Sequence, residues 1–252
     1  YEISQMTLNV IVIIGTITVI FAALMAIFAD DFKQVLAFST ISQLGYMTVA
    51  LGALGSFPAL LHVINHACFK ALLFLGAGSV IHSVGTGDIT KMGGVLKYQK
   101  ITGITMLLAT LSISGIPGFS GFVSKDEILL QVHASGYHWS YYVLLFTGMI
   151  TAFYMFRLYF LVFTGEKRSD YHGHESPLSM TIPLMILGAA SVFSGQLKYT
   201  IAGLLNITEF AHHNNLVVYS SVAAAAIGIA GAFLIYYLRI FDQNKIKNLV
   251  AG

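Results

Sequence analysis

The sequence predicts an all-α fold, a polytopic membrane helix bundle with about seven transmembrane helices, one of them discontinuous. Hydrophobic residues make up 56% of the 252 residues and charged residues only 10%, against about 25% charged in an average soluble domain. The apolar residues form continuous runs, whereas the strands of a membrane β-barrel alternate apolar and polar positions. This composition excludes a soluble globular enzyme and predicts a protein embedded in the lipid bilayer.

Charge and cysteine content exclude further classes. The net charge of +2 is too small for a nucleic-acid binder, so we expect no nucleic-acid partner. The single cysteine, Cys68, cannot support a disulfide framework, a cysteine-rich zinc site or an iron–sulfur cluster.

The spans follow from runs that lack Asp, Glu, Lys and Arg. A helix needs about 20 apolar residues to cross roughly 30 Å of hydrocarbon, and stretches rich in Gly, Pro and Ser separate the runs as turns. The predicted spans are residues 8–28, 34–54, 58–83, 101–131, 139–164, 178–197 and 216–238.

The fourth span is the discontinuous one. As a straight helix, residues 101–131 would be about 46 Å long, which exceeds the bilayer. Gly115, Pro117, Gly118 and Gly121 interrupt it, so we predict an unwound segment near residues 114–121. Unwound backbone inside a membrane is tolerated only where it lies within protein or lines a cavity, and transporters use it at ion sites.

Basic residues in the loops predict the orientation. Only Lys198 follows an even-numbered span, and the positive-inside rule therefore places the loops after odd-numbered spans in the cytoplasm and the N-terminus outside. The basic residues after odd-numbered spans are Lys33, Lys91, Lys97, Lys100, Lys167, Arg168, Arg239, Lys245 and Lys247.

A polar stripe crosses the third span. His62, His66 and Lys70 are spaced four residues apart, so they share one face of a helix. Such a stripe must face protein or water, and imidazole exchanges protons near neutral pH, which favours a proton relay. A packed helix with satisfied histidines is the plainer alternative. Zinc binding is a third, although Val63 shows that the His-Glu-x-x-His motif is absent.

Lys125, Asp126 and Glu127 follow the predicted break. Ionisable groups inside a bilayer are costly and mark ion pathways, so Lys125 is a candidate ion-pathway residue, with Asp126 and Glu127 beside it. The alternative is an interfacial cluster that closes the helix at the outer headgroups.

Three further charged residues are weaker candidates. Arg157 lies about two turns from the predicted cytoplasmic end of its span, so its side chain can extend to the headgroups by snorkelling. Asp31 and Lys33 open the second span, and an acidic residue at this place is also expected from the helix dipole alone.

Several ordered motifs resemble the antiporter-like subunits of respiratory complex I, most of all its chain L group, called subunit 5 in mitochondria. The similarity extends from about Asp30 to Gly165. The motifs are Asp31-Phe-Lys33, Ala37 to Tyr46, His62-x3-His66-x3-Lys70, Met92-Gly-Gly94, Pro117 to Leu129, and Arg157 to Gly165.

This resemblance implies a domain organisation. The family folds as two inverted five-helix repeats, each with one broken helix. Residues 1–165 would be the second five-helix proton-channel repeat, and residues 166–252 a cytoplasmic loop with two additional transmembrane helices. The first repeat and the C-terminal lateral helix are not in the sequence, so we expect a fragment of a longer protein.

The resemblance also implies function. The chain would be a membrane-arm subunit of an NADH:quinone oxidoreductase in a bacterial plasma membrane or an energy-converting organelle membrane. It would move protons through Lys70, His66, His62 and Lys125 with no redox site of its own. NADH, FMN, iron–sulfur clusters and quinone are expected in the partner subunits of the membrane and peripheral arms. The alternatives are a large subunit of a Mrp-type Na+/H+ antiporter or of a membrane-bound hydrogenase and, in another class, a membrane scaffold or metal transporter.

Overall fold

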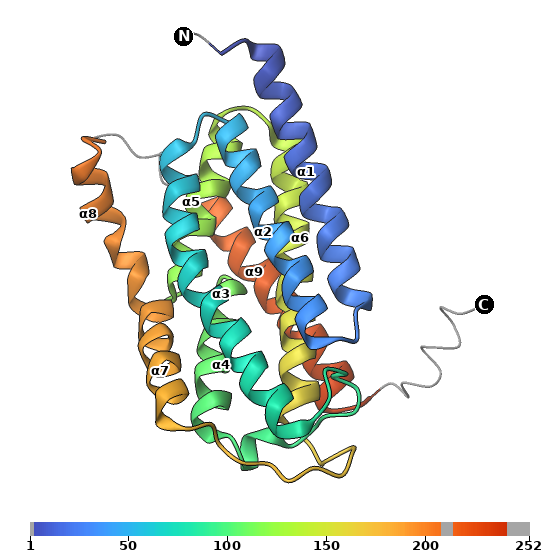
Figure 1. The fold of residues 1–252 in the computed structure, drawn as a ribbon. Helices are drawn as coiled ribbons and strands as arrows, with labels where there is room; N and C mark the ends of the chain where they lie inside the picture. Colours follow the sequence, from blue (N-terminus) through green and yellow to red (C-terminus); the bar gives the residue numbers. More distant parts are fainter. Residues whose placement is uncertain (1–2, 208–213, 241–252) are drawn as a thin grey trace.

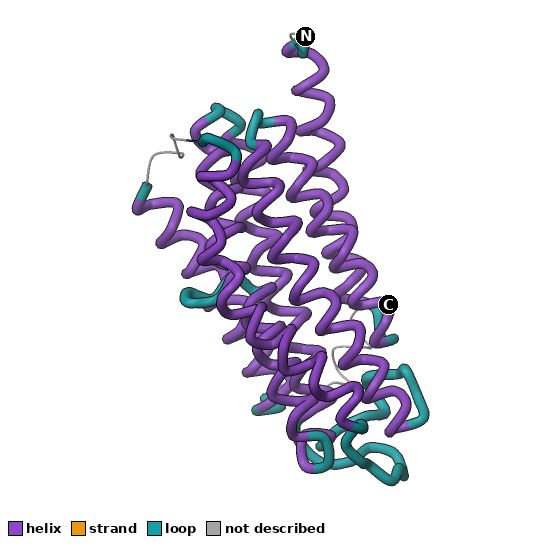
Figure 2. Tube along the Cα trace, turned by 60° about the vertical axis from the view of Figure 1, so that its left-hand side comes forward, coloured by secondary structure: helices purple, strands orange, loops and turns teal. Residues whose placement is uncertain are grey.

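A computed structural model of the chain describes residues 3–207 and 214–240, and Lys245 and Lys247 lie outside them. The described part is a bundle of helices without strands (Figures 1 and 2). The helices are α1 (Gln5–Phe28), α2 (Phe32–Gly52), α3 (Ser56–Val84), α4 (Lys100–Ile113), α5 (Ser120–Ala134), α6 (His138–Phe163), α7 (Leu178–Phe193), α8 (Leu197–Leu204) and α9 (Asn215–Ala232), with short turns at Val95–Lys97 and Ser194–Gln196 and a π-helical turn at Phe233–Tyr237.

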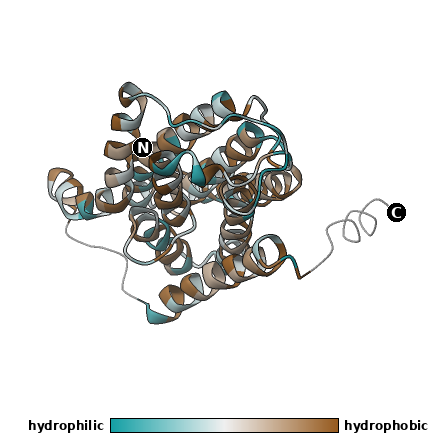
Figure 3. Cartoon of the chain, turned by 90° about the horizontal axis from the view of Figure 1, so that it is seen from below, coloured by the Kyte–Doolittle hydropathy of each residue, from teal (hydrophilic) through white to brown (hydrophobic). Residues whose placement is uncertain are grey.

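The predicted seven spans are present. Six helical segments of the described chain are long and apolar enough to cross a membrane, and the shorter α4 continues into α5 as the seventh, discontinuous span. The sixth span was predicted to end at residue 197, but α7 continues through a 3₁₀ turn into α8 and ends at Leu204. Hydrophobic residues dominate the helices, and hydrophilic ones gather in the connecting loops (Figure 3).

Glycines bring α1 and α2 unusually close. A Cβ atom on Gly15 would lie 2.9 Å from the backbone nitrogen of Val49, and one on Gly45 would lie 2.9 Å from that of Val19. Two apolar helices gain little from hydrophobic burial inside a lipid bilayer, so their association depends on such close van der Waals packing. The two helices therefore form a tight antiparallel pair at one side of the bundle (Figure 1).

The break in the fourth span forms where Gly and Pro predict it. α4 ends at Ile113, and α5 begins at Ser120 after a segment in which Gly115 (φ 77°) and Gly118 (φ 92°) have left-handed backbone angles. Residues with a Cβ atom rarely adopt these backbone angles. The segment lies between the two half-helices (Figure 1), with Ser114 and Gly115 buried and Pro117 and Gly118 exposed.

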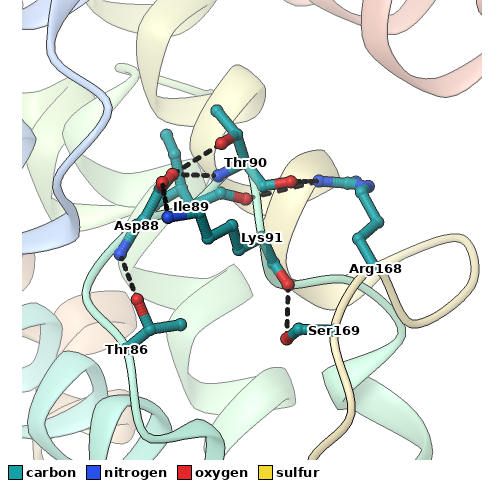
Figure 4. A network of polar contacts seen from close by, with 7 residues as sticks. All are labelled: Thr86, Asp88, Ile89, Thr90, Lys91, Arg168 and Ser169. Carbon is teal, nitrogen blue, oxygen red and sulfur yellow. Dashed lines mark hydrogen bonds and ion pairs between the residues drawn. The ribbon is translucent and has the colours of Figure 1, made fainter.

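The loops rich in basic residues meet at one end of the bundle. Phe32 donates a backbone hydrogen bond to Gly87, and Ile89 donates one to Asp30, so the α1–α2 corner contacts the loop after α3. Arg168, from the loop after α6, donates to the carbonyl oxygens of Ile89 and Thr90 (Figure 4). The grouping agrees with the predicted orientation, although the side of the membrane stays a prediction.

Hydrogen bonds also fix Asp88 within this loop. Partial burial would raise the pKa of Asp88, but hydrogen bonds from Thr90 and the nearby Lys91 ammonium outweigh it and hold the pKa below its usual value. Asp88 therefore stays ionised at neutral pH and orders the turn drawn in Figure 4.

Candidate functional site

The polar face of α3 is buried in the bundle. His62 is fully buried, while 8% of His66 and 5% of Lys70 are exposed. α2 and α5 both pack against α3, and they supply the contacts of these side chains. The helical spacing read from the sequence therefore places one imidazole, a second imidazole and an ammonium group in order along one interior face.

Lys70 forms the end of this line nearer the basic loops. Its Nζ donates to the carbonyl oxygen of Leu36, at 2.9 Å, and to the hydroxyl of Ser39. Both acceptors belong to the first half of α2. A buried ammonium group needs such oxygen partners because burial without hydrogen bonds is costly.

His62 joins three helices. Its Nδ1 lies 2.8 Å from Oγ of Ser124 on α5, and its Nε2 lies 3.0 Å from Oε1 of Gln43 on α2. The ring of His66 is centred 6.0 Å from that of His62, one turn nearer to Lys70. Nε2 of His66 has no hydrogen-bond partner within the described part of the chain, which leaves one ring nitrogen of the line available for proton exchange.

Lys125, on α5, bridges the break to the end of α4. Its Nζ donates a 2.7 Å hydrogen bond to the carbonyl oxygen of Ile113, the last residue of α4. This carbonyl lies at the negative end of the α4 dipole, where a cation is favourable. The side chain of Lys125 also lies against the ring of Tyr46, 5.3 Å from its centroid.

Asp126 and Glu127 point to other helices. Asp126 accepts a 2.7 Å hydrogen bond from Ser221 of α9, and Glu127 forms a 2.5 Å ion pair with Lys198 of α8. All three acidic or basic residues at positions 125–127 are at most 7% exposed. They are therefore buried between helices, which is unlike an interfacial cluster exposed at the headgroups.

A small cavity joins Lys125 and Asp126, which form no hydrogen bond with each other among the described contacts. Its volume is about 20 Å³, and Tyr46, Ser114 and Ser221 also line it. This volume accommodates one water molecule. Oδ2 of Asp126 and Oγ of Ser114 have no partner within the described chain, so both suit a water-mediated contact.

The remaining candidates lie at the basic-loop end, away from this line. Asp31 caps α2 by accepting from the backbone nitrogen of Gln34, at 2.9 Å, as expected for a helix start. The side chain of Lys33 is exposed and makes no hydrogen bond or ion pair in the described structure.

Arg157 does not snorkel, so that interpretation is wrong. Only 6% of it is exposed, and it donates to the carbonyl oxygen of Ala29, at 2.8 Å, and to Asp30, at 2.5 Å. The α1–α2 corner lies beside α6, and its oxygen atoms accept the hydrogen bonds of the guanidinium. Arg157 thus anchors this corner to α6.

Replacement of Arg157 by alanine is expected to lower stability by about 2 kcal/mol, because a buried carbonyl loses its charged donor. The ion pair with Asp30 contributes little to stability, since the side chain of Asp30 is 48% exposed. Arg157→Lys should restore only part of the stability, because lysine cannot donate in a fork. Thermal unfolding of the purified full-length protein measures this, with Lys33→Ala as the control. Equal melting temperatures for Arg157→Ala and the control would contradict the anchor.

Several functional contacts were not anticipated. Ser39 and Gln43 lie within the motif from Ala37 to Tyr46 but were not predicted as site residues, yet they hold Lys70 and His62. Their spacing of four residues was a usable signal of one shared face. Ser221 and Lys198 carried no local signal, because their partners on α5 are 95 and 71 residues away.

A multi-pass helix bundle with a broken span and a buried line of titratable side chains is an architecture of ion-translocating membrane proteins. Residues 1–155 match the family described as NADH:quinone oxidoreductase/Mrp antiporter, TM. The chain belongs to this family and is a multi-pass membrane protein.

Curated relatives agree. The chain is 43% identical to F(420)H(2) dehydrogenase subunit L of Methanosarcina mazei, over 96% of this chain and 42% of the relative. It is 39% identical to NADH-quinone oxidoreductase subunit L of Campylobacter jejuni, over 100% of this chain and 44% of the relative. The chain therefore spans less than half the length of these relatives.

Solved structures share the fold. The membrane-bound sulfane sulfur reductase, an archaeal respiratory membrane complex, contains a chain that matches with a TM-score of 0.75 and 27% identity, over 91% of this chain and 41% of that chain. A chain of the Mrp complex from Dietzia sp. DQ12-45-1b matches with a TM-score of 0.71 and 20% identity, over 91% of this chain and 49% of that chain. The predicted antiporter-like bundle is confirmed.

Proposed function

We propose that this chain is part of a membrane-arm subunit of a respiratory NADH:quinone oxidoreductase of the complex I type, in which it translocates protons. The observation that carries the proposal is the buried line Lys70, His66, His62, Ser124 and Lys125, which runs through the interior of the bundle to the break. The curated relatives named as subunit L support the choice of complex.

The chemistry of the line suits proton transfer between two ammonium groups. Lys70 and Lys125 are both buried and held by carbonyl oxygens, and two positive charges in a medium of low dielectric constant disfavour each other. Arrival of a proton at Lys70 therefore favours proton release from Lys125. His66 and His62 lie between them and carry the proton by exchange at their ring nitrogens.

The remaining expectations belong to this proposal. Residues 1–165 would form the second five-helix repeat, and residues 166–252 the additional helices, of a longer subunit. Electron transfer would take place in partner subunits that hold FMN, iron–sulfur clusters and quinone, while this chain supplies the proton path. Within the described residues no group of three or more His, Cys, Asp and Glu side chains is arranged to hold a metal ion, and the line consists of proton carriers.

The experiment that tests the proposal is gentle purification of the full-length native protein, followed by mass spectrometry of the co-purifying subunits. Recovery with flavin and iron–sulfur subunits, and electron transfer from NADH, is the expected result. Recovery with small hydrophobic subunits alone would contradict it and indicate a secondary cation/proton antiporter.

A second candidate follows from the Methanosarcina mazei relative, which matches nearly the whole chain and is named for a different electron donor. The proton path would be the same, but the donor-binding partner would differ. Activity of the purified complex with reduced F420 rather than NADH would identify this candidate.

The relay predicts the behaviour of a double variant. His62→Ala combined with His66→Ala is expected to slow proton translocation on the order of 100-fold, because it removes both positioned proton carriers between the lysines. Proton uptake by vesicles that contain the full complex measures this, at a known rate of electron transfer. His133→Ala with His138→Ala, which removes another pair of neighbouring histidines that lies away from the line, is the matched control. Wild-type translocation by the first variant would refute the relay.

A further inference from the structure

The start of α4 is capped by a residue from a distant loop. Oε2 of Glu175 accepts from the backbone nitrogens of Ile101, at 2.7 Å, and Thr102, at 3.4 Å, while its Oε1 accepts from the hydroxyl of Thr102, at 2.7 Å. The first backbone N–H groups of a helix lack partners inside the helix and need acceptors. Gln99, at the cap position, makes no side-chain capping bond, so Glu175 supplies the cap.

The loop around Glu175 is itself fixed to α3. The backbone nitrogen of His174 donates to Oγ of Ser83, at 3.1 Å, and the hydroxyl of Ser176 lies 2.6 Å from that of Ser79. Gln99 donates to the carbonyl oxygen of His174, at 2.8 Å. Glu175 is therefore held on both sides by hydrogen bonds, and it ties α4 to the end of α3.

The other end of α4 holds Lys125 through the carbonyl of Ile113. α4 has 14 residues, so the two ends are about 20 Å apart. A full span is fixed in depth by headgroups at both ends, but α4 ends inside the bundle and only its start reaches a loop. Any shift of its start along the helix axis would therefore move the carbonyl that binds Lys125. The negative charge at the start and the positive charge at the end both suit the dipole of α4.

We propose that Glu175 is a positioning residue for proton transfer at Lys125, because it fixes the start of α4 and thereby places the Ile113 carbonyl. This inference rests on the proposed function. It extends the site to a loop outside the segment that matches the family.

The test uses variants of the full-length subunit in the assembled complex, with two readouts. One is the amount of assembled complex, and the other is the number of protons translocated per electron transferred. Glu175→Ala is expected to lower the proton yield by roughly fivefold, because loss of one helix cap changes the ratio of correctly placed to displaced α4 by about that factor. Glu175→Gln should retain a nearly normal yield, because its amide oxygen still accepts from Ile101. Glu166→Ala, in the exposed part of the same loop, is the control and should behave as wild type.

A double variant separates positioning from general stability. Glu175→Ala added to Lys125→Ala should lower the proton yield no further, since the group that is positioned has gone. A normal proton yield in Glu175→Ala, with only less assembled complex, would overturn the inference and leave a structural cap. A normal yield in Lys125→Ala would instead refute the proposed function, so the two failures are distinguishable.

Discussion

Replacement of Lys125 by alanine in the full-length protein is expected to reduce proton translocation through this subunit on the order of 100-fold. Lys125 is the group at which the buried line meets the break, and its Nζ is held by the carbonyl oxygen of Ile113 at 2.7 Å. No other ammonium group among the described residues contacts this carbonyl. Proton uptake by vesicles at a matched rate of electron transfer measures the effect.

Two further variants sharpen this result. Lys125→Arg keeps a positive charge that can bind the carbonyl, but a guanidinium does not release its proton in proteins, so translocation should fail as in the alanine variant. Lys97→Ala removes a lysine whose side chain is exposed in the basic loops and should translocate normally. Full translocation by Lys125→Arg would show that charge alone is required there and would exclude proton release from Lys125.

The second large effect is expected for Gly121→Ala in the broken span. A Cβ on Gly121 would overlap the backbone carbonyl of Ser112, which cannot rotate away as a side chain can. The backbone nitrogen of Gly121 also donates to Oγ of Ser112, at 3.0 Å, which joins the two half-helices. We expect a loss of about 3 kcal/mol or more in stability, because the half-helices must separate.

Gly203→Ala is the matched control for this substitution. A Cβ on Gly203 meets no atom within 4 Å, and alanine favours helix more than glycine does. Thermal unfolding of the detergent-purified protein should show a large decrease for Gly121→Ala and none for Gly203→Ala. Similar melting temperatures for the two variants would show that the half-helices separate readily and that their close contact contributes little.

Hydropathy and turn residues predicted the spans and the break, because both depend on local sequence. The line from His62 to Lys70 was also predictable, since its members lie on one helix. Contacts between distant segments were not. The sixth span was ended before Lys198 because that residue is charged, but its ion pair with Glu127 lets the helix continue to Leu204.

Arg157 illustrates the same limit. A long side chain two turns from a helix end can either extend to the headgroups or bind a neighbouring backbone, and the sequence of its own span is compatible with both. Only the position of the α1–α2 corner, 128 residues away in the chain, decides between them. The contact of Asp126 with Ser221 was hidden for the same reason.

The close contact of α1 and α2 has a consequence for how the chain assembles in the bilayer. Gly15, Gly45 and Val19 all lie within the first 52 residues of the chain, and the corner between the helices is short. Two helices that are close in sequence and meet through small residues can pair without waiting for later spans. The α1–α2 hairpin is therefore able to form native packing before the helices that follow it are inserted, and it offers α6 a preformed surface when that helix arrives.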